Sequence, residues 1–508
     1  MPIDTQPKRN RLVTNWVLSF LSWGFPLLIA FFATPIIIRG LGTEQYGLYA
    51  LIIGFIGYTF STGVGKVAAK YIPEYRASGE PERLSETMSA ALWLAASVGL
   101  FEAVVLGALT PLLVSDVLLL PADSAQLIVW AMYVACLAGF SLTLSVLFQS
   151  AIQGRHRFDI YATVTSVSGL VSAAGSVLLV WKGYNVFSLV VWYSATTVLA
   201  AIAFGLTSWR LNPDWHPSLH VSRQTFAMVG RYAGSIVIYQ TLNSALLAFE
   251  RAWIVRKFGP EAVAYYAVPL MLALYMHGLL GSFVQVLFPI VNELLNDRDR
   301  LVRIYLRATK IMAAGTAFFA ASFIGAGETF LRLWIGPDFA ERSYELLVIL
   351  SLAYACNIIS MIAWLLAEAF KAPGLNAISS GLWTVVAIPL MVFFADTWQT
   401  EGIALGRFGG VLLTLPLVFY IELRFLGMIH SQFWAGMLIR LAPAVSAIIL
   451  IERYLFGRYE ASWPILILGV LTGTVAFGSI LAVTGFFNRE EISLALNRLP
   501  GWMRRAES

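Results

Sequence analysis

Residues 37–50 read IIRGLGTEQYGLYA, and residues 254–267 read IVRKFGPEAVAYYA. At a constant offset of 217 residues, six of the fourteen positions are identical: an Ile, an Arg, a Gly, a Glu, a Tyr and an Ala. Each copy is a small polar insert that ends one long apolar run and opens the next. A weaker match pairs AIQGRHRFD (151–159) with AEAFKAPGL (367–375). The chain therefore contains an internal duplication.

The apolar runs on either side of these inserts predict membrane-spanning helices. Of the 508 residues, 58% are hydrophobic and 12% are charged, and the mean hydropathy is +0.75, whereas soluble domains carry about 25% charged residues. In lipid each long apolar run must be helical, because no water is present to satisfy the backbone. We therefore expect an all-α polytopic membrane protein with about fourteen spans. They are placed at 13–38, 45–65, 88–113, 124–150, 159–181, 187–208, 225–252, 262–291, 305–325, 344–368, 375–395, 402–423, 434–454 and 463–486.

The duplication predicts how these spans are grouped. The repeat unit holds an even number of spans, so the two copies are related by a pseudo-twofold axis along the membrane normal. We expect one six-helix lobe at 1–210 and a second at 211–428. Residues 429–508 would add two spans and an amphipathic cytoplasmic tail. Two equal lobes leave a central cleft, and rocking them opens this cleft to each side of the membrane in turn.

Basic residues predict the orientation of the chain. Lys and Arg are concentrated in the N-terminus, the 66–86 loop, the QGRHRFD segment (153–159), the loop after the eighth span and the tail. The excess of positive charge in cytoplasmic loops then places both termini in the cytoplasm. The N-terminus lacks a cleavage site, so we interpret the first run as a retained helix of an inner-membrane protein. Both cysteines, Cys136 and Cys356, lie in apolar runs, which argues against a disulfide framework or a metal site.

Ionisable residues inside predicted spans are the first candidates for a functional site. Arg231, in the seventh span, either faces the cleft and holds phosphate or extends to the cytoplasmic surface. Lys66 and Lys70 end the second span, where they either capture an anionic headgroup or anchor the helix. Glu250 and Arg251 either form a charged pair that locks the lobes or stabilise a helix end.

Four further charged residues are secondary candidates. Arg39 and Arg256 occupy equivalent positions in the two copies of the repeat, and this recurrence favours a structural role in the turn. Glu102 and Arg407 lie within spans but belong to no motif. We find no set of residues that would make a catalytic centre, a metal site or a cofactor site, and the modest net charge of +5 gives no indication of nucleic-acid binding.

Two segments carry a resemblance to a known family. GLGTEQYGLYAL (40–51) looks like the signature that follows the first helix of the Wzx-type polysaccharide/oligosaccharide flippases, in the multidrug/oligosaccharidyl-lipid/polysaccharide exporter superfamily. ALLAFERAWIVRKFGPEAVAYYA (245–267) looks like its counterpart in the second half. The sequence departs from the pattern at Glu250, where the family leads us to expect Asp. The first span also lacks the pair of mid-helix Arg residues that the lipid II flippase branch would suggest.

The resemblance implies a function. Members of this family move undecaprenyl-pyrophosphate-linked oligosaccharides across the cytoplasmic membrane for surface polysaccharides such as O-antigen, lipopolysaccharide or exopolysaccharide. The resemblance implies alternating access through a central cationic cavity, with the lipid-linked oligosaccharide and membrane lipids as ligands. A polysaccharide polymerase and chain-length machinery are the protein partners that it suggests. It implies no enzymatic activity.

Two other functions remain open on the sequence. A cation-coupled multidrug antiporter of the same superfamily would be expected to hold buried carboxylates, of which Glu102 and Glu368 are the nearest candidates. A membrane glycosyltransferase or polymerase would be expected to carry a large extramembrane loop or an acidic cluster. The longest connections here are about 20 residues, at the upper end of structureless loops in compact domains, and the DRD at 297–299 lies among arginines.

Overall fold

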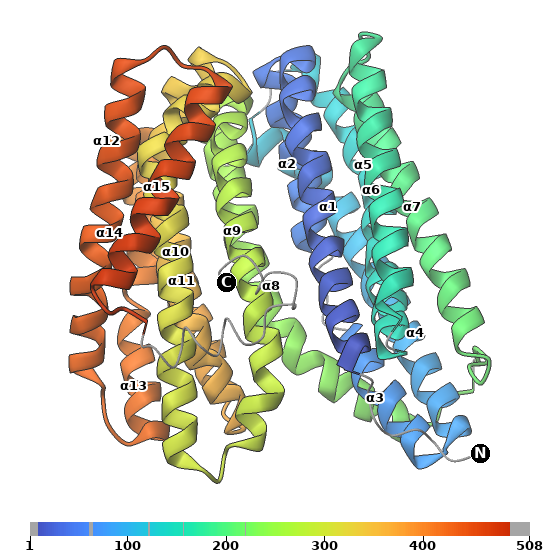
Figure 1. Cartoon of the computed structure of the whole chain (residues 1–508). Helices are drawn as coiled ribbons and strands as arrows, with labels where there is room; N and C mark the ends of the chain where they lie inside the picture. The colour runs from blue at the N-terminus through green and yellow to red at the C-terminus, as the bar shows by residue number, and fades with distance from the viewer. Residues whose placement is uncertain (1–8, 60–64, 120–121, 156, 219, 488–508) are drawn as a thin grey trace. The chain divides into compact units, whose positions relative to one another are not determined.

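The chain forms an all-helical structure in a computed structural model that describes residues 9–59, 65–119, 122–155, 157–218 and 220–487 (Figure 1). Within these residues there are fifteen α-helices and one short π-helix, and there is no β-strand. The α-helices are α1 (Arg9–Leu41), α2 (Thr43–Thr59), α3 (Gly65–Ser78), α4 (Pro81–Leu112), α5 (Ala122–Gly154), α6 (Phe158–Trp181), α7 (Val186–Leu211), α8 (Arg223–Phe258), α9 (Pro260–Glu293), α10 (Arg298–Trp334), α11 (Pro337–Ala369), α12 (Gly374–Leu412), α13 (Leu415–Leu426), α14 (Ser431–Arg458) and α15 (Trp463–Val483). The π-helix η1 (Leu113–Val117) extends α4.

Long apolar helices confirm the predicted polytopic fold. Ten segments of the described chain are long and apolar enough to cross a membrane, and each of the fourteen predicted spans overlaps a helix. The count of fourteen stays a prediction. With 17 residues, α2 is at the lower limit of what spans about 30 Å of hydrocarbon. The predicted amphipathic tail begins near residue 488 and lies outside the described residues.

The connection expected as a loop at 66–86 is instead largely helical. Helix α3 occupies most of it, and α4 begins at Pro81, before the predicted start of the third span at 88. Four apolar side chains of α3 are buried, namely Val67, Ala68, Tyr71 and Ile72. Their spacing of i, i+1, i+4 and i+5 forms one helical face, but Lys70 between them and the charged residues on either side make the segment too polar to be recognised as a span.

Helix α12 covers two predicted spans. Its backbone leaves the helical conformation at Trp398 and Gln399, which lies at a positive φ of 48°, and the gap between the predicted spans 375–395 and 402–423 contains this kink. An ion pair lies next to this kink: Nζ of Lys257 on α8 is 2.5 Å from Oδ1 of Asp396. A second interruption, between α12 and α13 at Leu413 and Thr414, was not predicted from the sequence.

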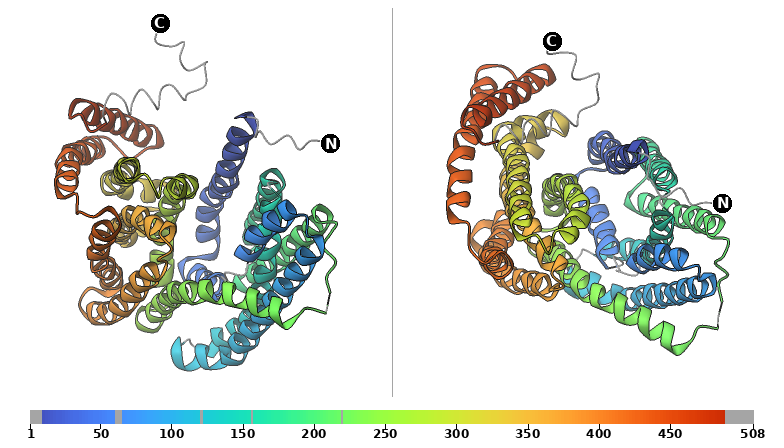
Figure 2. Two further views of the ribbon diagram at one scale, coloured as in Figure 1. Left: turned by 90° about the horizontal axis from the view of Figure 1, so that it is seen from below. Right: turned by 60° about the horizontal axis from the view of Figure 1, so that its bottom comes forward.

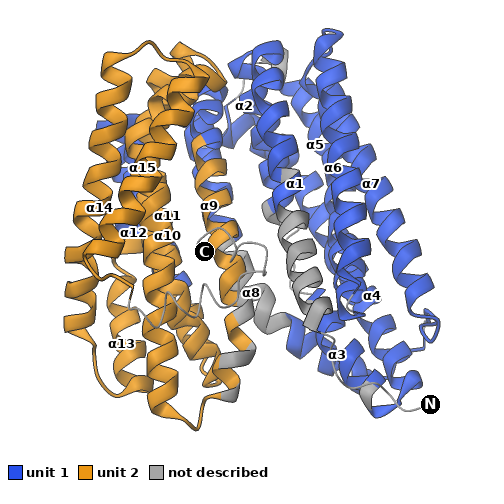
Figure 3. Ribbon diagram, viewed as in Figure 1, with its two compact units in different colours: residues 1–268, 380–410 blue, residues 269–379, 411–508 orange. Residues whose placement is uncertain are grey.

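The contacts within the chain divide it into two compact units (Figure 3). Unit 1 comprises Met1–Val268 and Ser380–Gly410, and unit 2 comprises Pro269–Ser379 and Val411–Ser508. Most of α12, residues 380–410, therefore packs with the first half of the chain. The two lobes at 1–210 and 211–428, and the pseudo-twofold axis between them, remain predictions.

The duplicated insert forms the same turn twice. Helices α1 and α8 end one residue before Gly42 and Gly259, whose φ angles are +80° and +84°. Glycine adopts this conformation without steric strain. The amide of Gly42 donates to the Ile38 carbonyl, and that of Gly259 donates to the Val255 carbonyl, both at 2.9 Å. The recurrence of the glycine in the sequence therefore reflects a recurring helix C-cap.

The two turns also contact each other within unit 1. Thr43 Oγ1 donates a hydrogen bond to Oε1 of Glu261 at 3.0 Å. A Cβ atom on Gly47 would collide with the carbonyl of Pro260, so a side chain at residue 47 would force the turns apart. Close packing of the two copies thus gives a second physical reason for glycine in the first one.

Each unit has its own apolar core. In unit 1 a cluster joins α3, α4, α5 and α8, with Ile72, Met88, Leu147 and Val229 among its buried members. In unit 2 a cluster joins α10, α14 and α15, with Leu441, Ile448 and Phe477 among its members. Figure 2 shows α14 and α15 lying side by side next to α10, as their contacts require.

Candidate functional site

The start of α8 is held against α4 by hydrogen bonds. Ser222 caps the helix: its hydroxyl accepts a bond from the Thr225 amide at 3.1 Å, which satisfies one of the free N–H groups of a helix start. The Ser222 amide donates to Oε1 of Glu86 on α4 at 2.8 Å. Trp93 Nε1, also on α4, donates to the Ser218 carbonyl at 2.8 Å. The segment before α8 and its first turn are therefore fixed to the first half of α4.

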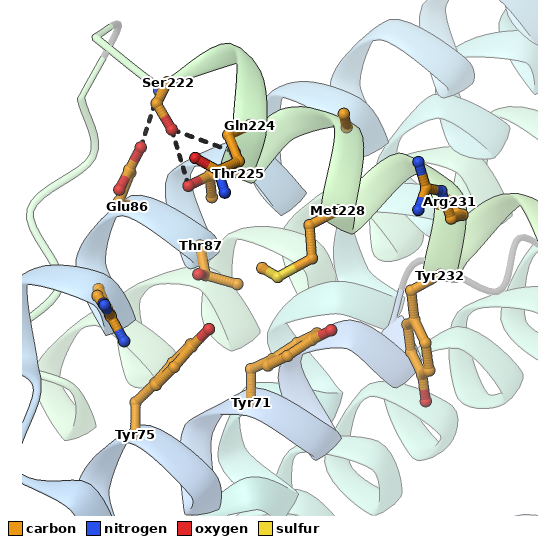
Figure 4. Close-up of a pocket in the computed structure, with 12 residues that line it drawn as sticks. Tyr71, Tyr75, Glu86, Thr87, Ser222, Gln224, Thr225, Met228, Arg231 and Tyr232 are labelled. Carbon is orange, nitrogen blue, oxygen red and sulfur yellow. Dashed lines mark hydrogen bonds between the residues drawn. The ribbon is translucent and has the colours of Figure 1, made fainter.

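A pocket of about 1100 Å³ lies between α3, α4 and the first half of α8 (Figure 4). Tyr71 and Tyr75 of α3 and Tyr232 of α8 line it. The rings of Tyr71 and Tyr75 stack with centroids 5.6 Å apart, and Tyr232 meets Tyr71 edge-on at 5.9 Å. This volume is near the upper end of ligand pockets, which range over about 300–1,000 Å³. The pocket can therefore hold a large ligand.

Polar side chains of α4 and α8 supply the rest of the lining. Thr87 comes from α4, and Gln224 and Thr225 come from the first turn of α8. Hydroxyl and amide groups can donate and accept hydrogen bonds. Together with the aromatic rings, they make a surface suited to a ligand that has both flat apolar faces and hydroxyl groups.

The structure places one predicted site residue, Arg231, in the lining of this pocket and a second, Lys70, beside two of the lining tyrosines. Arg231 lines the pocket and is exposed. Lys70 Nζ lies 4.5 Å and 4.6 Å from the ring centroids of Tyr71 and Tyr232 and donates to the Tyr71 hydroxyl at 3.3 Å. In the described part of the chain, no carboxylate lies within ion-pair distance of either cation. Both positive charges are therefore available to an anionic ligand.

A third cation and one carboxylate complete the charges of the pocket. Arg83 lines it, but its Nη1 lies 2.7 Å from Glu80, and both side chains are substantially exposed, so this pair is weak. The carboxylate is Glu86, which accepts the amide of Ser222. Partial burial of Lys70 disfavours its charge, but the hydrogen bond to the Tyr71 hydroxyl and the electrostatic attraction of Tyr71, Tyr232 and Glu74 together outweigh this effect and hold the pKa of Lys70 above its ordinary value. The pocket is therefore cationic at neutral pH.

Two other predicted residues form a buried ion pair elsewhere in unit 1. Glu250 of α8 is 0% exposed and Arg407 of α12 is 1% exposed. Arg407 Nε and Nη2 donate to the two carboxylate oxygens of Glu250 at 2.9 Å and 2.7 Å. Tyr266 donates its hydroxyl to the same carboxylate, and the guanidinium lies 5.4 Å from the Trp383 ring centroid. This two-pronged geometry is the strongest form of an Arg–carboxylate contact.

The sequence suggests that Glu250 and Arg251 pair with each other. In the structure each of them instead bonds to a residue far away in the sequence. The Glu250 carboxylate is bonded by Arg407, which lies 157 residues away. Arg251 Nη1 donates to the carbonyl of Ala50 on α2, and its guanidinium occupies the space that a Cβ on Gly54 would need. Arg251 therefore packs against α2, inside unit 1.

The remaining candidates lie apart from the pocket. Arg256 donates to the carbonyl of Asp116 at 2.9 Å, at the end of η1, and Arg39 is exposed in the last turn of α1. Glu102 is half-buried in the middle of α4, and no described group bonds to its Oε2. The backbone of Lys66 belongs to α3, but its side chain lies outside the described part of the structure.

The three tyrosines of the pocket were not identified from the sequence. Tyr71 and Tyr75 are one helical turn apart and follow Lys70 directly, so an aromatic and basic pattern was present on α3. The charged residues of this segment are typical of a loop, and a loop has no helical face on which to recognise the pattern. Among the described residues, no three His, Cys, Asp or Glu side chains come together in a way that could hold a metal ion.

Comparisons with known proteins relate the chain to polysaccharide biosynthesis. The family model described as "Polysaccharide biosynthesis protein" matches residues 12–295. A relative from Shigella flexneri, described as "Putative O-antigen transporter", is 20% identical over 436 residues, which cover 81% of this chain and 98% of the relative.

Two solved structures share the fold. The lipid II flippase MurJ in an inward closed conformation is similar with a TM-score of 0.73 and 12% identity, over 93% of this chain and 99% of that one. An inward-facing multidrug resistance transporter of the MATE family, in the MOP superfamily, gives a TM-score of 0.67 and 14% identity, over 82% and 98%. These similarities show the fold of a multi-pass membrane protein. Because the family model matches more than half of the sequence, the chain belongs to the polysaccharide biosynthesis protein family.

Proposed function

We propose that this protein is a flippase that moves a lipid-linked oligosaccharide across the bacterial inner membrane for the synthesis of a surface polysaccharide. The family, the O-antigen transporter relative and the fold shared with a lipid II flippase support this proposal. The ligand would be an undecaprenyl-pyrophosphate-linked oligosaccharide, whose lipid chain stays in the bilayer while its headgroup enters the protein.

The observation that carries the proposal is the cationic, tyrosine-lined pocket of unit 1. Arg231 and Lys70 have no carboxylate within ion-pair distance among the described residues, and the pocket of about 1100 Å³ has room for more than one sugar ring. A guanidinium binds phosphate through two parallel hydrogen bonds. Stacked tyrosine rings offer flat faces for the apolar sides of sugars. Such a pocket would therefore suit a pyrophosphate-linked sugar headgroup.

The physical need for a protein is clear for such a ligand. A polar group that enters hydrocarbon without a hydrogen-bonding partner is disfavoured by about 2–7 kcal/mol, and a charged pyrophosphate is disfavoured far more. Cations and hydroxyl groups along the path replace the lost water. Alternating access between two lobes, a central cationic cavity and cytoplasmic termini remain part of the proposal, as do contacts with a polysaccharide polymerase and chain-length machinery.

Deletion of the gene, followed by analysis of lipid-linked sugars, tests the function. A flippase predicts that the complete lipid-linked oligosaccharide accumulates and that it stays in the inner leaflet, inaccessible to reagents added outside spheroplasts. Loss of its synthesis would instead indicate an enzyme. Unchanged export combined with greater sensitivity to several drugs would indicate a multidrug antiporter.

Substitutions in α8 test the site. Arg231→Ala removes a pocket cation and is expected to reduce export at least tenfold, which corresponds to about 1.4 kcal/mol, without lowering protein levels. Arg223→Ala is the matched control, because Arg223 lies on the same helix, is exposed and does not line the pocket. Export that is normal in both Arg231→Ala and Lys70→Ala would contradict the assignment of this pocket.

A further inference from the structure

Helix α14 of unit 2 carries a carboxylate where its packing pattern calls for an apolar side chain. The buried residues of α14 are Met437, Leu441, Ala444, Ile448 and Glu452, which recur every three or four positions. The first four belong to the apolar cluster shared with α10 and α15. Glu452 continues this stripe by one turn and is itself 0% exposed. An ionisable side chain has thus replaced the next apolar residue of a helix seam.

The facing helices are shaped to accept this side chain. A Cβ on Gly325 of α10 would collide with Oε2 of Glu452 and would lie only 3.0 Å from its Cβ. A Cβ on Gly473 of α15 would lie 3.4 Å from Oε1. The carboxyl group therefore fills a slot that two glycines leave open on two different helices. A slot of this kind fixes the position of Glu452 between α10, α14 and α15.

Both oxygens of Glu452 lack a hydrogen-bonding partner among the described residues. The neighbouring Arg453 on α14 is directed to another residue, since its Nη2 donates to the hydroxyl of Tyr344 on α11 at 3.3 Å. Tyr344 in turn donates to the carbonyl of Ile324, next to the slot, at 2.6 Å. Two residues near the slot on α10, Glu328 and Arg332, are exposed and pair with each other.

The third helix of the slot offers no charge at all, because α15 contains no titratable residue. An ionised carboxylate buried without a partner is strongly disfavoured, so such a group takes up a proton. A metal cation would need several more oxygen ligands than one carboxylate provides. The chemistry of the slot therefore selects H⁺.

We propose that Glu452 is a proton-binding site whose loading and release are coupled to export. The protonated side chain fits the seam between α10, α14 and α15. Loss of the proton to water leaves a negative charge among apolar side chains, and this charge favours separation of α14 from the two glycine-bearing helices. Proton binding and helix movement are thus linked in unit 2. The coupling to export rests on the proposed function, whereas the proton binding does not.

The pH dependence of stability tests proton binding without any ligand. The midpoint of thermal unfolding of the purified protein is expected to fall as the pH rises, because deprotonation of Glu452 disfavours the closed seam. Glu452→Gln, which is neutral at every pH, should flatten this dependence. The matched control is Glu328→Gln, which removes an exposed carboxylate of α10 and should follow the wild-type curve. An unchanged curve in Glu452→Gln would overturn the proposal.

Reconstitution tests the coupling. Proteoliposomes would contain the lipid-linked oligosaccharide extracted from the deletion strain, and oxidation of sugars by membrane-impermeant periodate would report their leaflet. An imposed pH gradient is expected to accelerate translocation by the wild-type protein, and Glu452→Gln should translocate equally fast with and without the gradient. No translocation by the wild-type protein would contradict the proposed function, whereas translocation that ignores the gradient would overturn the coupling alone.

Discussion

The two copies of the duplicated insert share a turn but differ in the helix before it. Gly42 and Gly259 end their helices with the same positive φ and the same hydrogen bond. At the same offset of 217 residues, Glu250 corresponds to Ala33, and both positions are buried, at 0% and 7% exposure. A small apolar residue in one copy is therefore a charged residue in the other.

The partners of Glu250 show how the second copy accommodates this charge. Tyr266 bonds to Glu250 and has an identical counterpart in Tyr49, so it does not distinguish the copies. Arg407 is the distinguishing partner, and it comes from the kinked helix α12. The comparison teaches that the turn is a shared structural element and that the copies have diverged in the buried positions just before it.

The largest effect is expected from the position where the copies differ most. Glu250→Ala would remove the carboxylate from Arg407 and should lower the free energy of unfolding by about 3–5 kcal/mol, since a buried charge is left without its counter-charge. Thermal or denaturant unfolding of the purified protein measures this loss. The double variant Glu250→Leu with Arg407→Met should regain most of it. A double variant no more stable than Glu250→Ala would show that the pair is not what holds α8 and α12 together.

An equal and intermediate effect is expected from the shared turn. Gly42→Ala and Gly259→Ala each force a Cβ onto a backbone with positive φ, and each should be destabilising by about 1–3 kcal/mol. Gly57→Ala serves as control, because this glycine of α2 lies at an ordinary helical φ and has open space where the Cβ would go. If only one of the two turn variants loses stability in the unfolding assay, the copies are not structurally equivalent.

A smaller effect is expected from the contact between the copies. Thr43→Val keeps the shape of the side chain and removes its hydrogen bond to Glu261, which should lower the free energy of unfolding by about 1 kcal/mol. Tyr265→Phe removes the other hydroxyl that donates to the same oxygen, at 2.8 Å. Because both hydroxyls share one acceptor, the double variant should not be additive. Strictly additive losses would indicate that the two bonds act independently.

The smallest effect is expected at the exposed arginines of the turn. Arg256→Ala would remove a donor to the carbonyls at the end of η1, and contacts of this type contribute about 0.3–1 kcal/mol. Arg39→Ala, at the equivalent position of the first copy, should have a similarly small effect on thermal unfolding. Loss of export with normal stability in either variant would assign these residues a role beyond the turn.

The helices and turns could be predicted from the sequence wherever they depend on neighbouring residues. The apolar runs predicted the helices, and the repeat predicted two equivalent turns, because a helix end with a left-handed C-cap needs glycine at one fixed position. Helix α3 escapes recognition for a local reason as well: its buried face has only four side chains, and the charged residues among and around them, Lys66, Lys70, Glu74 and Arg76, are typical of a polar loop.

The candidate site was predictable only in part, because it depends on contacts between distant segments. The sequence indicates Arg231 as a charge inside a predicted span and Lys70, with Lys66, as charges at a span end, but nothing local indicates that α8 crosses α3 where the tyrosines lie. The ion pair of Glu250 and Arg407 joins residues 157 positions apart. Neighbouring charges, such as Arg251, are the partners that sequence suggests first, although packing decides which partner is reached.

The hydrogen bonds that fix Ser218 and Ser222 to α4 have a consequence for how the pocket can change shape. These hydrogen bonds join two walls of the pocket, α4 and α8, at one end. At the opposite end, beside Arg231, α8 meets α3 through the contacts of the Tyr232 ring with Tyr71 and Lys70. If the proposed function holds, we expect a long glycan to enter the pocket from the Arg231 end and the hydrogen-bonded end to limit how many sugar units fit.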